Sequence, residues 1–449
     1  MKFEDFSNLV FQEGKKEMHD MEIFYESRRE VQIEIFNNQV DKYIVSDSSG
    51  VSLRGFAGKG MGYSYTEKLD EESARMIIDE AIKNGEYTDS KERASFSRPL
   101  KHKDIWSQKE KNINELSVEE KIDLMTNLEK IALSMDRRVS NLQVCSYEEF
   151  SIDREIKNTN GVNLSDSMSG GYVHLSVLAK DGDDTRTGSS MFLFRDPKDI
   201  DIAKIAREAV VESVSLLNGR PVKSGKYKVV IKNRVFSEML EGFMPAFSGE
   251  NVQEGLSFLI GRIGSVIGSE NLTIIEDPLL DSGFSTCRFD DEGFPTTYKR
   301  IIEKGVLKEY LFNSRAANKE GMVSTGNGFR DSYRALVGTR PTNIIVSPGA
   351  ISRERMIESI EKGLYITDVA GLHSGLNPVS GDFSLQAQGY LIKEGDIKRP
   401  VNGITISGNF IEMLSNIYDI SDDIYLGFPG KGHYGAPSIK INMVDISGY

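Results

Sequence analysis

The first hundred residues alternate apolar and polar side chains in short runs, which is the period of a half-buried β-strand. These runs cover residues 21–25, 31–36 and 50–56. They predict a sheet with one solvent-exposed face. The glycine-rich residues 58–62 lead into another alternating run and therefore predict a hairpin, since a phosphate loop would lead into a helix. Asp70 then begins a predicted helix whose apolar residues share one face until about residue 85.

A second unit follows a polar stretch at residues 89–111, where we place a domain boundary. Ser117 and Glu120 have the spacing of a capping box and predict a helix start. From residue 139 to 194 the alternation returns in long runs around turns rich in Gly, Asn and Asp, which predicts a β-meander. A helix is predicted at residues 202–217, before a second boundary.

The rest of the chain predicts a larger domain. The pattern indicates a strand at 227–231, helices at 235–247 and 252–267, and a last strand at 438–443. The predicted class is thus α+β and multidomain, with mixed, mostly antiparallel sheets, covering helices and a β-rich C-terminal domain. The expected domains are residues 1–100, 108–220 and 225–449. Residues 159–164 echo residues 48–53, each expected at a turn that enters a strand, which either reflects duplicated sheet units or shared turn chemistry.

Composition narrows the class of protein. There are 55 Lys and Arg against 68 Asp and Glu, a net charge of −13 without a basic stripe, which disfavours nucleic-acid binding. No stretch approaches the roughly 18 apolar residues of a membrane helix, and the N-terminus lacks a secretory pattern. Cys145 and Cys287 lie far apart without a CxxC motif, so we expect a cytoplasmic protein with incidental thiols, although one disulfide stays open.

The familiar catalytic motifs are missing from the sequence. None of the five histidines is followed by glutamate, and there is no P-loop or G-x-S-x-G elbow. The densest polar segment is 371–384, where backbone N–H groups between glycines can approach a ligand. Its candidate residues are His373, Asn377, Ser380, Gly381 and Asp382. They either line a site or only close tight turns, and His433 in the glycine-rich segment 428–437 has the same two interpretations.

Several segments together resemble the TldD/PmbA family of peptide-cleaving proteins, also called modulators of DNA gyrase. They are residues 272–278, 289–293, 301–307 and 380–384, and the resemblance is strongest from residue 229 to the end. TldD-type members hold zinc with a His-Glu-x-x-x-His helix and a cysteine near the C-terminus, and zinc makes a nucleophile of bound water. The corresponding helix here, 235–247, has no histidine, and no cysteine follows Gly427. The family's metal ligands and catalytic residues therefore cannot be transferred to this chain.

In lacking these zinc ligands the chain resembles the PmbA/TldE branch of the family. It also resembles this branch in residues 372–383. The resemblance implies a heterodimer in which a TldD-type partner carries the zinc, no cofactor in this chain, and unfolded peptides as substrates. We expect His373, Asn377, Ser380, Gly381, Asp382 and His433 to line the peptide chamber. Two alternatives stay open: an autonomous hydrolase with a metal or base held by His373, Asp382 and His433, and a non-enzymatic homodimer that binds peptides or proteins.

Overall fold

The computed structural model describes residues 1–58, 60–88, 94–99, 113 and 116–449. Helices and several sheets are both present, which confirms the predicted α+β class. The boundary expected at residues 89–111 lies mostly outside the described residues, and the predicted domain limits stay a prediction. Among the described residues, none of the helices combines the length and the apolar character needed to cross a bilayer.

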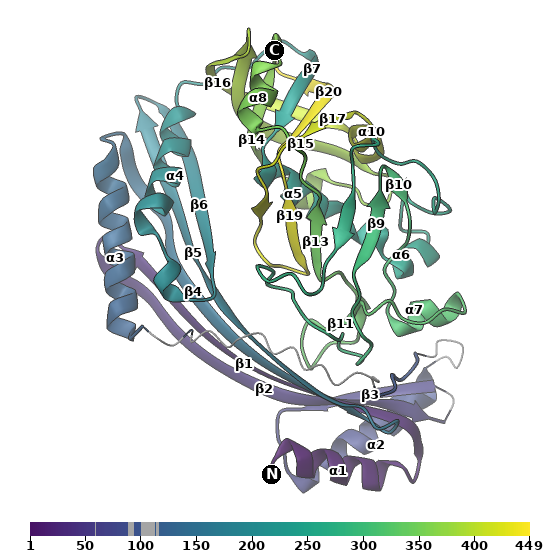
Figure 1. The fold of residues 1–449 in the computed structure, drawn as a ribbon. Coiled ribbons are helices and arrows are strands. Elements are labelled where there is room, and N and C mark those ends of the chain that lie inside the picture. The colour runs from purple at the N-terminus through teal and green to yellow at the C-terminus, as the bar shows by residue number, and fades with distance from the viewer. Residues whose placement is uncertain (59, 89–93, 100–112, 114–115) are drawn as a thin grey trace.

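The first half of the chain forms two α-β-β-β-α units that share one curved sheet (Figure 1). The first unit contains α1 (Phe3–Gly14), β1 (Met18–Phe36), β2 (Gln39–Ala57), β3 (Gly60–Thr66) and α2 (Glu71–Tyr87). The second contains α3 (Val118–Met135), β4 (Val139–Asn158), β5 (Asn163–Asp181), β6 (Asp184–Phe194), the 3-10 turn η1 (Pro197–Asp199) and α4 (Ile202–Ser215). The strand order is β3-β2-β1-β4-β5-β6, so β1 and β4 join the two units at the centre of the sheet.

The strands are longer than the alternation predicts. The polar residues 26–30 lie inside β1, and they pair with β2 on one side and with β4 on the other. Residues 48–53 lie within β2, so the expectation that they enter a strand at a turn is wrong, whereas residues 159–164 do connect β4 to β5. The two segments are therefore not equivalent. The support for duplicated units comes from the repeated order of elements instead.

The helix starts predicted at Asp70 and Ser117 in this half of the molecule are confirmed. The side chain of Asp70 accepts a hydrogen bond from the N–H of Ser73 at 2.8 Å and caps α2. Ser117 and Glu120 form a complete capping box at α3. The apolar faces of α1 and α2 pack on one end of the sheet and those of α3 and α4 on the other, with the C-terminal half on its concave side (Figure 1). The curved sheet thus spans two small cores.

The C-terminal half contains two six-stranded sheets around one large core. One sheet consists of β16 (Asp396–Asn409), β15 (Asp382–Lys393), β14 (Lys362–Ala370), β7 (Gly225–Ile231), β20 (Ile439–Ser447) and β17 (Ile417–Ile420). The other consists of β10 (Val306–Leu307), β9 (Lys299–Glu303), β8 (Ile274–Glu276), β13 (Asn343–Val346), β19 (His433–Ala436) and β18 (Tyr425–Leu426). The short strands β11 (Gly328–Phe329) and β12 (Gly338–Thr339) pair separately.

The helices of this half are mostly short. They are α5 (Asn233–Phe243), η2 (Met244–Phe247), α6 (Gly249–Gln253), α7 (Ser314–Lys319), α8 (Arg353–Glu358), α9 (Leu372–Gly375) and α10 (Phe410–Ser415). The helix predicted at 235–247 is confirmed as α5 and η2, but the helix predicted at 252–267 is wrong because α6 ends at Gln253. Gly255, Gly261 and Gly264 adopt φ values of 78°, 69° and 80°. These left-handed conformations interrupt a helix that the apolar spacing alone would favour.

Candidate functional site

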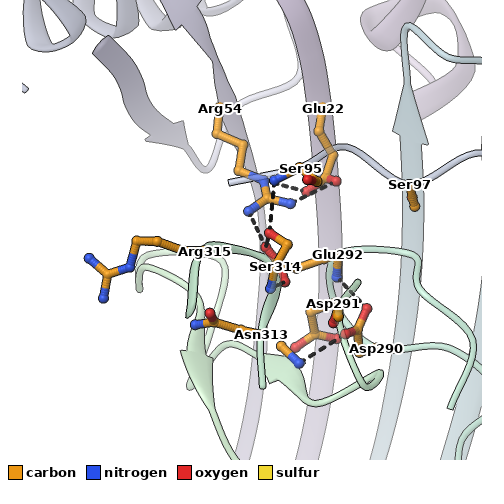
Figure 2. A network of polar contacts seen from close by, with 12 residues as sticks. Glu22, Arg54, Ser95, Ser97, Asp290, Asp291, Glu292, Asn313, Ser314 and Arg315 are labelled. Carbon is orange, nitrogen blue, oxygen red and sulfur yellow. Dashed lines mark hydrogen bonds and ion pairs between the residues drawn. The ribbon is translucent and has the colours of Figure 1, made fainter. Parts of the chain in front are cut away.

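A buried ionic network attaches the C-terminal half to the sheet (Figure 2). Arg54 on β2 donates to the two carboxylate oxygens of Glu22 on β1, at 2.8 and 3.0 Å, and to Glu292 at 2.6 Å. Arg330 donates to the same Glu22 at 2.9 Å. These four side chains are at most 5% exposed, and charges buried to this extent are stable only when they are paired. The network therefore fixes how the two halves meet.

The acidic triplet Asp290-Asp291-Glu292 supplies the C-terminal side of this contact. Asp291 accepts from Arg154 of β4 at 2.8 Å, and Glu292 also accepts from the N–H and the hydroxyl of Ser314 at 2.7 and 2.6 Å. Asp290 accepts backbone N–H bonds from Glu292 and Phe294 of its own loop and from Gly328 of β11, while burial beside Glu292 raises its pKa. We call Glu22, Arg54, Arg154, Asp291, Glu292 and Arg330 the clamp. The triplet thus has a structural role.

Two cavities lie between the sheet and the C-terminal half. The smaller has a volume of about 310 Å³ and is lined by β1, β4 and clamp residues. The larger, of about 860 Å³, is lined by β6, α4, α5 and β14 and is called the α5 cavity below. The Phe428 ring lines both cavities and packs edge-on against Tyr172, with 5.0 Å between the ring centroids. This aromatic pair separates two adjacent spaces.

Helix α5 presents a polar stripe to the α5 cavity. Its apolar residues Val235, Phe236, Met239, Leu240 and Phe243 are fully buried in the large core. Arg234, Glu238 and Glu241 line the cavity, and their spacing of four and then three residues places them on the other face. Arg234 binds Glu212 of α4 at 3.2 Å and Asp368 of β14 at 3.0 Å, which ties the helix to the walls on either side.

The carboxylates of Glu238 and Glu241 are the half-buried acidic groups of this stripe. Within the described part of the chain, neither makes a hydrogen bond or an ion pair. Burial raises the pKa of Glu238 to about 7, although Arg234 nearby opposes the shift, and burial also raises the pKa of Glu241. His174, on the facing sheet, has a lowered pKa, mainly through burial and then through Arg234. The cavity thus holds two half-buried acids whose charged forms burial disfavours, and Arg234 partly compensates for this at Glu238.

The loop predicted as the candidate site packs against the C-terminal end of α5. Leu376 packs over Gly242, where a Cβ would lie 2.2 Å from the Leu376 Cδ1. Asn377 accepts from the N–H groups of Val379 and Ser380 at 2.9 and 3.3 Å. Most polar groups of this loop therefore close its own turns, as the simpler interpretation of the sequence had it.

The other polar groups of this loop also form hydrogen bonds with neighbouring protein groups. Asp382 accepts from Asn409 at 3.0 Å, which is the main reason that its pKa is lowered. Gly381 has a φ of 83° and donates its N–H to the Asn377 carbonyl at 2.8 Å. His373 lies exposed on α9. A role of these residues in lining a chamber stays a prediction.

His433 lies apart from that loop, in the β13–β19 sheet. Its side chain is 0% exposed, Nδ1 accepts from the N–H of Phe284 at 3.0 Å, and Nε2 lies 2.9 Å from the Gly427 carbonyl. Burial lowers its pKa to about 4, so the ring is neutral at neutral pH. Among the residues that the structure describes, no group of three His, Cys, Asp or Glu side chains is placed to hold a metal ion. His373, Asp382 and His433 thus do not assemble the metal site of the autonomous-hydrolase alternative.

Family models cover nearly all of the described chain. They are the PmbA/TldA metallopeptidase domain 1 at residues 21–85, the central domain at 111–217 and the C-terminal domain at 224–448. The chain belongs to the PmbA/TldD metallopeptidase family. A protein of Methanocaldococcus jannaschii named only as uncharacterized is 31% identical over 417 residues, which cover 91% of this chain and 93% of that protein.

Other members of the family are also similar to this chain over most of its length. A metalloprotease TldD homologue of Buchnera aphidicola is 29% identical over 429 residues, 89% of this chain and 86% of its own. A Thermotoga maritima crystal structure, described as a modulator of a DNA gyrase, has a TM-score of 0.90 at 32% identity. It aligns with 99% of this chain and 100% of its own. The PmbA/TldD fold therefore includes both halves of the described chain.

The metal that the family name implies can be tested against these residues. At the cavity, α5 offers Ser237, Glu238 and Glu241 without an imidazole, and His174 of β5 lines the same cavity without forming a three-ligand group with them. Cys145 and Cys287 are 3% and 4% exposed, and neither lines the α5 cavity. The described residues do not fit a zinc site of imidazole and thiolate ligands, and we derive no metal-dependent step for this chain.

Glu238 and Glu241 were not among the residues predicted from the sequence, although a signal was present. Two carboxylates three residues apart, preceded by Arg234, interrupt a helix that is otherwise apolar. Such a stripe on a core helix indicates a face that borders either solvent or a cavity. Only the fold shows that it borders a cavity.

Proposed function

We propose that this chain is the PmbA/TldE-type subunit of a cytoplasmic metallopeptidase complex that cleaves unfolded peptides. In this proposal a TldD-type partner carries the zinc, and this chain forms one wall of the peptide chamber. The observation that carries the proposal is α5, the helix that corresponds to the family's zinc-binding helix. It borders a cavity of about 860 Å³, yet it presents an arginine, a serine and two glutamates.

The two cavities suit the task of holding an extended chain. Ligand pockets commonly measure about 300–1,000 Å³ and combine apolar walls with a few polar groups. Tyr365, Tyr390 and Tyr425 supply such walls in the α5 cavity. The smaller cavity continues on the other side of the Tyr172 and Phe428 pair. We propose that a peptide passes along both, with the 371–384 loop at the end of α5 lining the chamber.

The test compares the purified chain, a TldD-type homologue from the same source, and the mixture of both. Zinc content and cleavage of an unfolded protein substrate are measured for each sample. We expect cleavage, sensitive to a chelator, to be strongest in the mixture, with the zinc in the partner. The matched control is a mixture whose TldD-type chain carries glutamine in place of the glutamate of His-Glu-x-x-x-His. Zinc-dependent cleavage by this chain alone, or a mixture in which the two chains do not associate, would refute the proposal.

A further inference from the structure

We infer that the smaller cavity binds one aromatic side chain of the chambered peptide, between rings that the sheet and the C-terminal half contribute together. The four rings are Phe150, Tyr172, Phe284 and Phe428, and all of them line this cavity. The inference rests on the proposed function, because it treats the cavity as part of a peptide chamber. It adds a preference for aromatic side chains to a substrate class otherwise defined only as unfolded.

The sheet contributes the first two rings. In the pairing of β4 with β5, Tyr172 lies opposite Glu148, and Phe150 lies opposite Gly170. Opposite residues point to the same face of a sheet, as do residues two positions apart along a strand. Phe150 and Tyr172 are therefore diagonal neighbours on the face that borders the cavity, and both are only partly buried. Their rings form an apolar strip across two strands.

The third ring comes from the C-terminal half and fills a space that a glycine leaves. A Cβ at Gly170 would lie 2.5 Å from Cε1 of Phe284, so this ring packs on the sheet where a side chain is missing. It lies edge-on to Phe150, with 6.4 Å between the centroids and 62° between the planes. The N–H of Phe284 donates to Nδ1 of the buried His433 at 3.0 Å, and Arg195 lies over the ring, 4.6 Å from its centroid. Phe284 is thus a fixed apolar floor of the cavity.

The fourth ring, Phe428, stands at the border with the α5 cavity. Among the described residues, it is the only one that lines both cavities. It is 44% exposed, although it packs edge-on against Tyr172. The preceding Gly427 is held in place, because its N–H donates to the Tyr434 carbonyl at 2.8 Å and its own carbonyl lies 2.9 Å from Nε2 of His433. A side chain that enters from the α5 cavity would cover the uncovered part of the Phe428 ring.

Ion pairs within the chain compensate charged groups of the cavity wall. Arg154 binds Asp291 at 2.8 Å, and Arg28 binds Glu30 at 2.5 Å. Burial and then Asp291 raise the pKa of Glu26, while Arg154 and Arg28 oppose the rise. These acids have cations nearby in the same wall, so a charged ligand gains no advantage over a neutral one. The rings are the part of the wall that a ligand can use.

The size of the cavity limits what can bind among the rings. The volume is about 310 Å³, and an apolar cavity of roughly 150 Å³ holds a benzene molecule. One aromatic side chain with its methylene stem therefore fits. Rings in edge-on contact gain affinity beyond the burial of apolar area, which an aliphatic side chain does not. We therefore expect phenylalanine to be preferred over leucine, and leucine over alanine.

The experiment measures, by anisotropy, the binding of fluorescent unfolded peptides to the full-length chain mixed with the glutamine variant of the TldD-type homologue. Three peptides differ only at one central position, which is phenylalanine, leucine or alanine. We expect the phenylalanine peptide to bind at least about tenfold more tightly than the alanine peptide, with the leucine peptide between them. Phe428→Ala removes a ring and Ile44→Trp fills the cavity from a residue that is 43% exposed, so each should reduce this ratio to about threefold or less. Tyr87→Ala, at a 90% exposed residue of α2 outside both cavities, should preserve the ratio.

Each outcome decides one question. Equal affinity for the three peptides, or a ratio that survives both Phe428→Ala and Ile44→Trp, overturns the inference. N-acetylphenylalanine amide that competes as well as the phenylalanine peptide also overturns it, because the cavity would then serve free amino-acid derivatives. In these cases, cleavage of all three peptides by the mixture with the unaltered TldD-type homologue leaves the proposed function standing. If no peptide binds and that mixture cleaves none of them, the proposed function fails together with the inference.

Discussion

Replacing Arg54 by methionine should loosen the attachment between the sheet and the C-terminal half. Arg54 makes two hydrogen bonds to Glu22 and one to Glu292. After the substitution Glu22 keeps Arg330, but among the described residues Glu292 keeps only the two donors of Ser314. Removing one member of a buried ion pair leaves an uncompensated charge and typically costs about 3–5 kcal/mol. We expect a loss of that size in the free energy of unfolding.

The loss should depend on pH in a defined direction. Without Arg54 the pKa of Glu292 rises in the folded state, because its charged form is buried without a cation. The penalty is therefore complete above that raised pKa and shrinks as the pH falls towards the unfolded value of about 4.3. Urea unfolding followed by circular dichroism at pH 8 and pH 5 measures the effect. If the transition is not two-state, the unfolding midpoint of the first step serves instead.

Arg29→Met is the matched control, since Arg29 lies on the same sheet with a side chain that is 56% exposed, 3.5 Å from Asp47. Its effect should stay within about 0.5 kcal/mol at both pH values. The reasoning is refuted if Arg54→Met is as mild as this control, or if its penalty is equally large at pH 5 and pH 8.

Two further predictions concern packing and the buried histidine. A Cβ at Gly62 would lie 1.7 Å from the carbonyl oxygen of Ala81, so Gly62→Ala should destabilise by about 1–3 kcal/mol in urea unfolding, while Gly338→Ala, with open space around it, should change little. Burial lowers the pKa of His433 to about 4, so its contribution is present above the unfolded value of about 6.5 and lost as the pH falls towards 4. The stability difference between the wild type and His433→Gln should therefore narrow between pH 7 and pH 4.5, and a constant difference would contradict the burial argument.

Local chemistry made part of the fold predictable from the sequence. The capping box at Ser117 and the cap at Asp70 depend on residues three positions apart, so the pattern contains all that decides them. The pairing of β1 with β4 joins residues as distant as Glu22 and Asn158, and no local pattern encodes that register. The helix expected at 252–267 failed because three glycines outweigh apolar spacing.

The candidate site was less predictable for the same reason. The 371–384 loop is conspicuous in composition, yet Asn377 closes its own turn and the Asp382 carboxylate binds Asn409 at the end of β16. Glu238 and Glu241 gain their character from burial beside α4 and β14, elements that lie far away in the sequence. A sequence pattern shows which residues share a face, but it does not show what that face meets.

The long strands of the shared sheet are attached to the C-terminal half of the chain at two separate places. At about 3.3 Å per residue, the 19 residues of β1 span roughly 60 Å. The first attachment is the clamp, which includes Glu22 near the start of β1. The second is Glu212 on α4, which pairs with Lys232 and Arg234 of the C-terminal half. Both cavities lie between these two attachments. Bending of the strands between two fixed ends would change the clearance of both cavities without breaking either attachment.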